Sequence, residues 1–189
     1  MTKQKTSALA TELLSNLHGI EIGASAHNPF NLNTKNVDYT DDYSTVFKRE
    51  EFKICGEYAK VDIVANGDEL PLEDNSQDFV ISSHVIEHFW DPVKAIKEWM
   101  RVTKEGGYIY IICPHKFRTF DIDREITHFD EIISRHGKPM PPDSNPHQHW
   151  SVWDTQAFID LCNALGWNIY TYQDIDDKVG NGFAVVLKV

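Results

Sequence analysis

Hydrophobic positions along the chain alternate between the spacing of a helix and the short continuous runs of a buried strand. Leucines three and four positions apart predict an N-terminal helix over 7–17. A short apolar run at 19–22 predicts the first strand, and 36–39 predicts a second. The mixed residues at 42–59 are expected to be mostly helical. This opening alternation favours a sheet that is covered by helices.

Two runs rich in β-branched residues predict the next strands, at 61–66 and 78–83. Asp91 is expected to cap a helix, because a proline follows it at the first helical position. The glycine pair at 106–107 is expected to end that helix. A buried strand at 108–113 follows directly, so the middle of the chain repeats the strand–helix–strand order.

The C-terminal part predicts one more helix and a final pair of strands. Asp154 or Thr155 caps the helix, and Gly166 stands where a helix C-terminal glycine belongs. The runs at 167–173 and 182–189 are close enough in sequence to pair antiparallel. The alternation along the whole chain therefore predicts an α/β fold, a doubly wound and mostly parallel sheet with helices on both faces.

A long irregular segment, 114–150, interrupts this alternation, and it is too long for an ordinary connection. It follows the fifth strand, at the ligand end of such a sheet. We therefore expect a single domain over 1–189 with 114–150 inserted as a cover over the binding site. A helix is predicted within 123–137, because four apolar residues form one stripe there: Ile126, Phe129, Ile132 and Ile133.

Composition narrows the classes of partner. The net charge of −11 disfavours nucleic acid, because phosphate backbones bind basic surfaces. Three well-separated cysteines, Cys55, Cys113 and Cys162, fit reduced thiols in the cytoplasm better than a disulfide framework. The first 17 residues are too polar for a signal peptide, and no stretch approaches the ~20 apolar residues that span a bilayer. We therefore expect a cytoplasmic protein without a membrane partner.

Polar residues follow the predicted strands at the sheet edge where ligands of doubly wound folds bind. An acid at 38 suits the two hydroxyls of a ribose, because one carboxylate accepts both protons. An acid at 68, in a glycine turn, suits an adenine amino group. The candidate cofactor-binding residues at these strand ends are Glu21, Gly23, Ala24, Ser25, Asp38, Asp68, Glu69 and His84.

Three stretches carry a family resemblance: "IEIGAS" at 20–25, the run from "NGDELP" to "GGYIYI" at 66–111, and "FIDLCNALGWNI" at 158–169. Together they resemble the small class I S-adenosylmethionine-dependent methyltransferases. The resemblance implies a Rossmann-like, seven-stranded sheet of order 3-2-1-4-5-7-6, with the last strand antiparallel. It also implies S-adenosyl-L-methionine as the cofactor, bound across the first four strand ends.

The stretches 114–133 and 147–158 are similar to methyltransferases of glycan and polysaccharide biosynthesis. This second, less specific resemblance implies a small-molecule or sugar-type acceptor that is methylated at oxygen. The cover at 114–150 would then lie on the acceptor side.

The turn after the first strand departs from the family pattern of an acid followed by three alternating glycines. Gly23 stands at the first glycine position, but Ser25 and His27 occupy the second and third. We expect the usual first crossover helix to be shortened or replaced by a loop. The altered turn also leaves a second interpretation open, in which the same fold is a non-catalytic cofactor-binding or protein-interaction module.

An oxygen acceptor must lose its proton, and histidine is suited to take it because its ordinary pKa is ~6.5. His115, directly after the fifth strand, and His149, before the last predicted helix, are the favoured catalytic bases. His84, His128 and His147 are the alternatives.

A metal site is the competing interpretation of these histidines, because His147 and His149 would share one face of an extended chain. No carboxylate stands at a recognised ligand spacing from them, so a histidine base without a bound metal is expected. The pair Glu87 and His88, at a predicted helix start, fits packing or capping as well as a role in the site.

Overall fold

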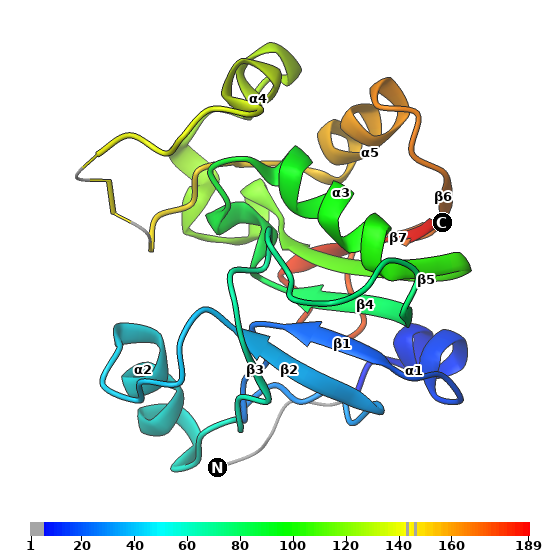
Figure 1. Ribbon diagram of the computed structural model, residues 1–189. Coiled ribbons are helices and arrows are strands. Elements are labelled where there is room, and N and C mark those ends of the chain that lie inside the picture. The colour runs from blue at the N-terminus through cyan, green and yellow to red at the C-terminus, as the bar shows by residue number, and fades with distance from the viewer. Residues whose placement is uncertain (1–5, 143, 146) are drawn as a thin grey trace.

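A seven-stranded sheet forms the centre of the computed structural model, which describes residues 6–142, 144–145 and 147–189 (Figure 1). The strand order is β3-β2-β1-β4-β5-β7-β6, and β7 runs antiparallel to both β5 and β6. This confirms the predicted fold class and strand order. The strands are β1 (Gly19–Ile22), β2 (Thr34–Asp38), β3 (Ile63–Val64), β4 (Gln77–Ser83), β5 (Thr103–Pro114), β6 (Ile169–Gln173) and β7 (Gly182–Lys188).

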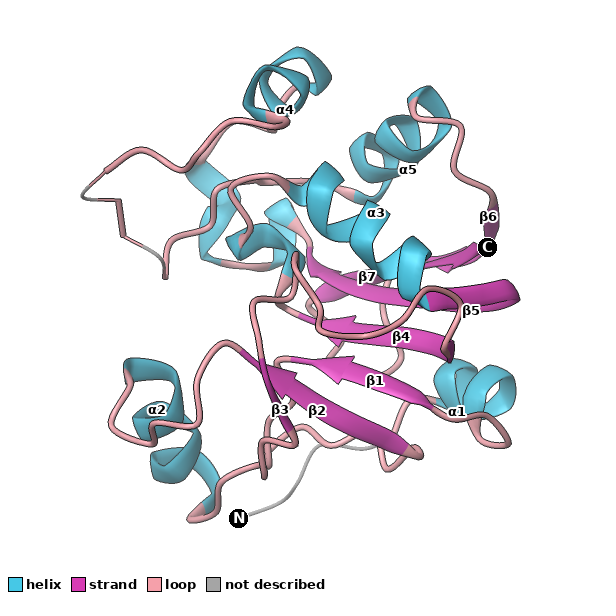
Figure 2. Ribbon diagram, viewed as in Figure 1, coloured by secondary structure: helices cyan, strands magenta, loops and turns pink. Residues whose placement is uncertain are grey.

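Helices cover both faces of the sheet (Figure 2). Alternate residues of β4 point to opposite faces, so Val80 belongs to one hydrophobic cluster and Phe79 to the other. The helices α3 and α5 pack on the Val80 side, whereas α1 packs on the Phe79 side. The helices are α1 (Ala8–Leu14), α2 (Val46–Cys55), α3 (Pro92–Val102), α4 (Phe129–Arg135) and α5 (Thr155–Ala164), with short 3-10 helices η1 (Ile86–His88), η2 (Lys116–Arg118) and η3 (Phe120–Asp123).

The connection between β1 and β2 contains no helix, as expected from its sequence. The chain passes directly from Ile22 through a loop to Thr34. The next helix, α2, lies beyond the carboxyl ends of β1 and β2 rather than on a face of the sheet (Figure 1). With no helix between β1 and β2, the helix α2 forms part of the wall at the ligand end of the sheet.

The glycine pair does not end α3, which was the sequence prediction. The helix ends at Val102, and Thr103 already belongs to β5, where its hydroxyl donates to the carbonyl of Trp99 at 2.6 Å. The glycines lie within β5 at a break in its register with β4. A Cβ on Gly107 would stand 2.6 Å from the carbonyl oxygen of Asp78, so this close strand contact requires a glycine.

The helix predicted within 123–137 is shorter than expected and covers only 129–135. Of the predicted apolar stripe, Ile132 is buried, whereas Phe129 and Ile133 are exposed. The preceding residues are held away from a helix because Thr127 pairs with Val152, its N–H donating to the carbonyl and its hydroxyl accepting from the N–H, each at 2.9 Å. The strand β3 is also shorter than expected, because it has two residues where the sequence predicted six at 61–66.

Two of the three thiols are buried in the protein interior, and their pKa values are raised by that burial. Cys113 lies at the end of β5 and Cys162 in α5, and the pKa of Cys162 is raised to about 12. Cys55, at the end of α2, is only half-buried. Within 6–142, 144–145 and 147–189, no helix combines the length and the apolar character needed to cross a bilayer.

Candidate cofactor site and an adjoining histidine–glutamate cluster

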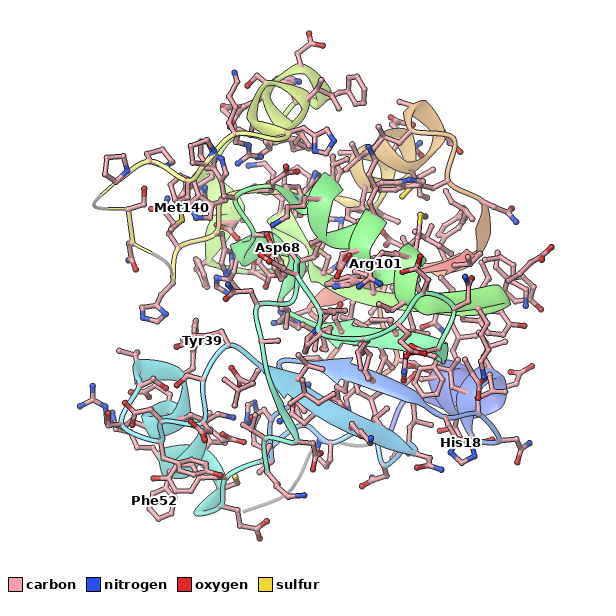
Figure 3. The ribbon with its side chains drawn as sticks, in the orientation of Figure 1. His18, Tyr39, Phe52, Asp68, Arg101 and Met140 are labelled. Carbon is pink, nitrogen blue, oxygen red and sulfur yellow. The ribbon has the colours of Figure 1, made fainter. Side chains whose placement is uncertain are left out.

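A cleft of about 970 Å³ opens at the carboxyl ends of the central strands. Its wall combines residues from separate parts of the chain, including Tyr39 after β2, Asp68 after β3 and Met140 from the long segment before α5 (Figure 3). Seven of the eight candidate cofactor-binding residues line it: Glu21, Gly23, Ala24, Ser25, Asp38, Asp68 and His84. Glu69 is not part of the lining.

The turn after β1 needs a glycine at one position only. Gly23 has a φ of +67°, and a Cβ there would stand 2.9 Å from the side chain of Val85. The next residues have ordinary negative φ values, so Ser25 and His27 are accommodated without strain. The hydroxyl of Ser25 lies 2.6 Å from Nδ1 of His27, and the N–H of Ala24 donates to Oδ1 of Asn36. The altered turn is therefore a well-bonded structure.

Glu21 is a buried carboxyl group in the wall of the cleft. Burial raises its pKa to about 7, while the nearby Lys178 ammonium and a hydrogen bond from Thr34 act in the opposite direction. The folded chain therefore binds this proton more tightly than the unfolded chain, whose glutamate has a pKa of 4.5. The proton on Glu21 therefore stabilises the folded state. This stabilisation is complete below pH 4.5 and is lost as the pH rises to about 7.

We therefore expect Glu21→Gln to gain stability relative to the natural chain as the pH rises from 4.5 to 7. The gain should reach about 3 kcal/mol and then stay constant, because 1 pKa unit corresponds to about 1.4 kcal/mol. Urea unfolding of both cofactor-free proteins at pH 5 and pH 8 measures the difference. A difference that does not change with pH would show that this carboxyl group titrates normally.

Asp38 ends β2 and forms an ion pair with the buried ammonium of Lys48, at 3.1 Å through Oδ2. Lys48 also lies 3.4 Å from Glu51 of the same helix, so of these two ion pairs only the one with Asp38 links α2 to the end of β2. A carboxylate has about four acceptor positions, so the ion pair leaves room for a ribose hydroxyl. The contribution of Lys48 was not foreseen from sequence, where it belongs to a mixed segment without a clear pattern.

Asp68 stands in a turn that is fixed by the core. Its Oδ2 accepts from Lys94 at 3.0 Å. The preceding Gly67 packs tightly, because a Cβ there would stand 2.8 Å from the ring of Phe89. The carbonyl of Gly67 accepts from the indole N–H of the buried Trp99 at 2.7 Å. The position of the Asp68 side chain at the cleft thus depends on Trp99, a residue of α3 in the core.

The two histidines favoured as bases lie in different surroundings. His115 is buried outside the cleft lining, and its Nδ1 accepts from the N–H of Phe117 at the start of η2. His149 is also outside the cleft lining, but its ring packs against His88, which lines the cleft, and its Nδ1 lies 2.6 Å from Oδ2 of Asp121. The carboxylate of Asp121 also accepts from Arg124 at 2.7 Å. Only His149 therefore has the orienting carboxylate that a catalytic histidine commonly uses.

His149 belongs to a cluster with Glu87 and His88, which we call the Glu–His cluster. Glu87 is 1% exposed, and neither of its carboxyl oxygens has a hydrogen-bond partner among the described residues. Oε1 of Glu87 stands 3.9 Å from Nε2 of His88 and 3.9 Å from Nε2 of His149. Of the other predicted histidines, His84 has its Nδ1 4.0 Å from the same oxygen, and it lines the cleft.

Burial sets the protonation of the Glu–His cluster. It raises the pKa of Glu87 to about 8, with a further contribution from the nearby Asp121. It lowers the pKa of His88 to about 4, with a further contribution from His149. Glu87 caps no helix, because η1 begins without a side-chain cap. The cluster therefore holds a desolvated acid beside the His88 imidazole, whose lowered pKa favours its neutral form, and such shifted groups are typical of functional sites.

Residues 4–111 match a family model described as a methyltransferase domain, which is more than half of the chain. The chain belongs to this methyltransferase family. The resemblance seen in the sequence is thereby confirmed, and family membership implies S-adenosylmethionine as the cofactor. It also supports enzyme activity.

Among curated relatives, a probable S-adenosylmethionine-dependent methyltransferase of Mycolicibacterium smegmatis is 41% identical over 69 residues. That match covers 36% of this chain and 26% of the relative. An uncharacterised protein of Methanocaldococcus jannaschii is 32% identical over 96 residues, covering 49% of this chain and 42% of the relative. The chain thus spans between a quarter and a half of these relatives.

Solved methyltransferase structures share the fold. A methyltransferase of Thermotoga maritima has a TM-score of 0.60 at 18% identity, over 95% of this chain and 86% of that one. One from Methanosarcina mazei has a TM-score of 0.58 at 15% identity, over 98% of both chains. The seven-stranded architecture of this methyltransferase family member is thus common to both structures.

Proposed function

We propose that this protein transfers a methyl group from S-adenosylmethionine to an oxygen atom of a small-molecule or sugar-type acceptor. The observation that carries the proposal is a cleft whose wall contains Gly23, Asp38 and Asp68 and whose edge adjoins the Glu–His cluster. Asp38 accepts the ribose hydroxyls and Asp68 the adenine amino group. The acidic charge of the chain and its free thiols fit a cytoplasmic enzyme of small substrates.

The reaction is an in-line displacement in which the protein mainly positions two reactants. An oxygen lone pair of the acceptor forms the bond to the methyl carbon, and the electrons of the broken sulfur–carbon bond remain on sulfur. The products are a methyl ether, S-adenosylhomocysteine and one proton. In this proposal the acceptor proton leaves near the Glu–His cluster, because His88 of the cluster lines the cleft next to the buried carboxyl group of Glu87.

The segment 114–150 covers the acceptor side in this proposal. Lys138, Pro139, Met140 and His147 of this segment line the cleft, opposite Phe47 of α2. The ring of His147 packs edge-on against Phe47 at 4.6 Å between centroids. This contact joins the two walls above the cofactor-binding strand ends.

Asp38→Ala should weaken the binding of S-adenosylhomocysteine about tenfold or more. Loss of a hydrogen bond to a charged group typically costs ~1.5–3 kcal/mol, and every 1.4 kcal/mol is about tenfold in affinity. Isothermal titration measures the affinity, and Asp41→Ala serves as a control because that acid is exposed on the loop after β2. Equal affinities in the two variants would remove Asp38 from the ribose site.

The acceptor class is tested by incubating the protein with labelled S-adenosylmethionine and a panel of sugar nucleotides, free glycans and small amines. Label in an ether-linked product of a hydroxylated acceptor supports the proposal. Label found only on amines would replace oxygen by nitrogen as the accepting atom. Tight binding of S-adenosylhomocysteine without transfer to any compound would favour the non-catalytic interpretation of the fold.

A further inference from the structure

We propose that Glu87, His88 and His149 bind one divalent transition-metal ion, which contacts the acceptor hydroxyl during methyl transfer. The binding of the ion follows from the geometry of the three residues alone. Its use in the reaction rests on the proposed function. This assignment replaces the metal-free histidine base that was expected from the sequence.

The three side chains converge on one point. One ligand atom from each, a carboxyl oxygen and two imidazole nitrogens, lies within 4.8 Å of the others. Both Nε2 atoms are 3.9 Å from Oε1 of Glu87. Ligands of a tetrahedral Zn²⁺ ion at about 2.1 Å are about 3.4 Å from each other, so small inward shifts bring these atoms to bonding positions.

Both histidines are oriented for ligation. Nδ1 of His88 lies 3.1 Å from the carbonyl oxygen of Gln148, which can only accept, so this nitrogen carries the proton. Nδ1 of His149 likewise donates to the carboxylate of Asp121. Both Nε2 atoms therefore present lone pairs toward Glu87. Such an outer hydrogen bond, from a histidine to a carboxylate or a carbonyl, accompanies almost every metal-bound histidine.

Glu87 provides the independent observation that points to a ligand. Its carboxyl group is buried, and both oxygens lack hydrogen-bond partners among the described residues. A buried polar group without a partner is costly and rare in folded proteins. A protonated Glu87 donating to a histidine would require a separation near 2.7 Å, whereas Nε2 of His88, Nε2 of His149 and Nδ1 of His84 are 3.9–4.0 Å from Oε1. A cation bound by Oε1 and the two Nε2 atoms would give each of these three atoms a partner.

The donor types select the class of ion. Two imidazoles and one carboxylate suit zinc and neighbouring transition metals, whereas calcium and magnesium prefer oxygen ligands. Three protein ligands leave a position for a further oxygen, as in catalytic zinc sites. His88 lines the cleft, so this position is accessible to an acceptor. The bound ion would lower the pKa of the acceptor hydroxyl, whose proton then leaves to water.

The test is a titration of the chelator-treated 189-residue protein with Zn²⁺ alone. We expect one tightly bound ion per chain, and at least ~10²-fold weaker binding in Glu87→Gln and in His149→Ala. Asp121→Asn removes only the outer carboxylate and should weaken binding by about 10–100-fold. His128→Ala is the matched control, because His128 is exposed in the same segment of the chain. This control should bind Zn²⁺ as the natural protein does.

Binding of S-adenosylhomocysteine, measured on the same samples, reports whether each variant is folded and separates the two proposals. Weak Zn²⁺ binding that is unaffected by Glu87→Gln and His149→Ala would overturn the metal site, even where S-adenosylhomocysteine binds. Cluster-dependent Zn²⁺ binding without S-adenosylhomocysteine binding would support the metal site and overturn the proposed cofactor. Loss of Zn²⁺ binding in His128→Ala would assign the ion to surface histidines and also overturn the site.

Discussion

Alanine in place of His149 is expected to lower the turnover of methyl transfer by at least ~10²-fold while leaving the affinity for S-adenosylhomocysteine within a few-fold. Removal of the proton from the acceptor typically contributes ~10²–10⁴ to such a rate, and His149 is the histidine that Asp121 orients and that packs on His88 of the cleft wall. Single-turnover assays with labelled S-adenosylmethionine measure the step. Unchanged turnover would show that the Glu–His cluster takes no part in the reaction.

His115→Ala is the matched comparison, because the sequence favoured both histidines equally. Neither histidine belongs to the cleft lining, but His115 packs beside Phe117 and Phe183 and is not part of the Glu–His cluster, so we expect its loss to change turnover only a few-fold. A chelator separates the two roles that His149 can have. A metal ligand predicts that chelation stops turnover and that Zn²⁺ restores it, whereas a simple base predicts no effect of either treatment.

Trp99→Ala should be the most destabilising single substitution that we predict. Trp99 is fully buried in the core, packs edge-on against Phe89 and donates to the carbonyl of Gly67. Replacing a buried tryptophan by alanine typically costs about 3–5 kcal/mol, which corresponds to a fall in Tm of about 6–20 °C for a domain of this size. Thermal unfolding measures the change.

Tyr170→Ala provides the control for Trp99→Ala, because Tyr170 is 53% exposed and contacts Tyr108 at the sheet surface. Its loss should cost less than about 1 kcal/mol. Trp99→Ala should also weaken cofactor binding at temperatures well below the Tm of the variant. The reason is that Trp99 donates to the carbonyl of Gly67, in the turn that carries Asp68. A Tm within 2 °C of the natural protein would contradict the role of Trp99 as the centre of this packing.

The fold and most of the residues predicted to line the cleft were predictable because they depend on local patterns. The Asp91-Pro92 start of α3 and the acids at the ends of β2 and β3 are read directly from a few neighbouring residues. The boundary of α3 was not predictable in the same way. The glycine pair has the sequence of a helix end, but its position inside β5 depends on contact with Asp78 of another strand.

The Glu–His cluster could not be predicted from spacing, because its members are brought together by tertiary contacts. The N–H of Trp150 donates to the carbonyl of Glu87 at 2.7 Å, and this bond places His149 beside η1. The side chain of Arg135 holds the same segment in place by donating to the carbonyl of Trp150 at 2.8 Å. The sequence signal was present in the Glu87–His88 pair, but its third member is supplied by a distant loop.

The unequal burial of the three thiols makes the protein suitable for site-selective labelling without mutagenesis. A thiol must ionise and be reached to react with a maleimide, and both conditions disfavour Cys113 and Cys162. Cys55, half-buried at the end of α2, is therefore the expected site of attachment. The same helix carries Lys48 against Asp38, so a fluorophore at Cys55 would report whether this wall of the cleft responds when S-adenosylhomocysteine is added.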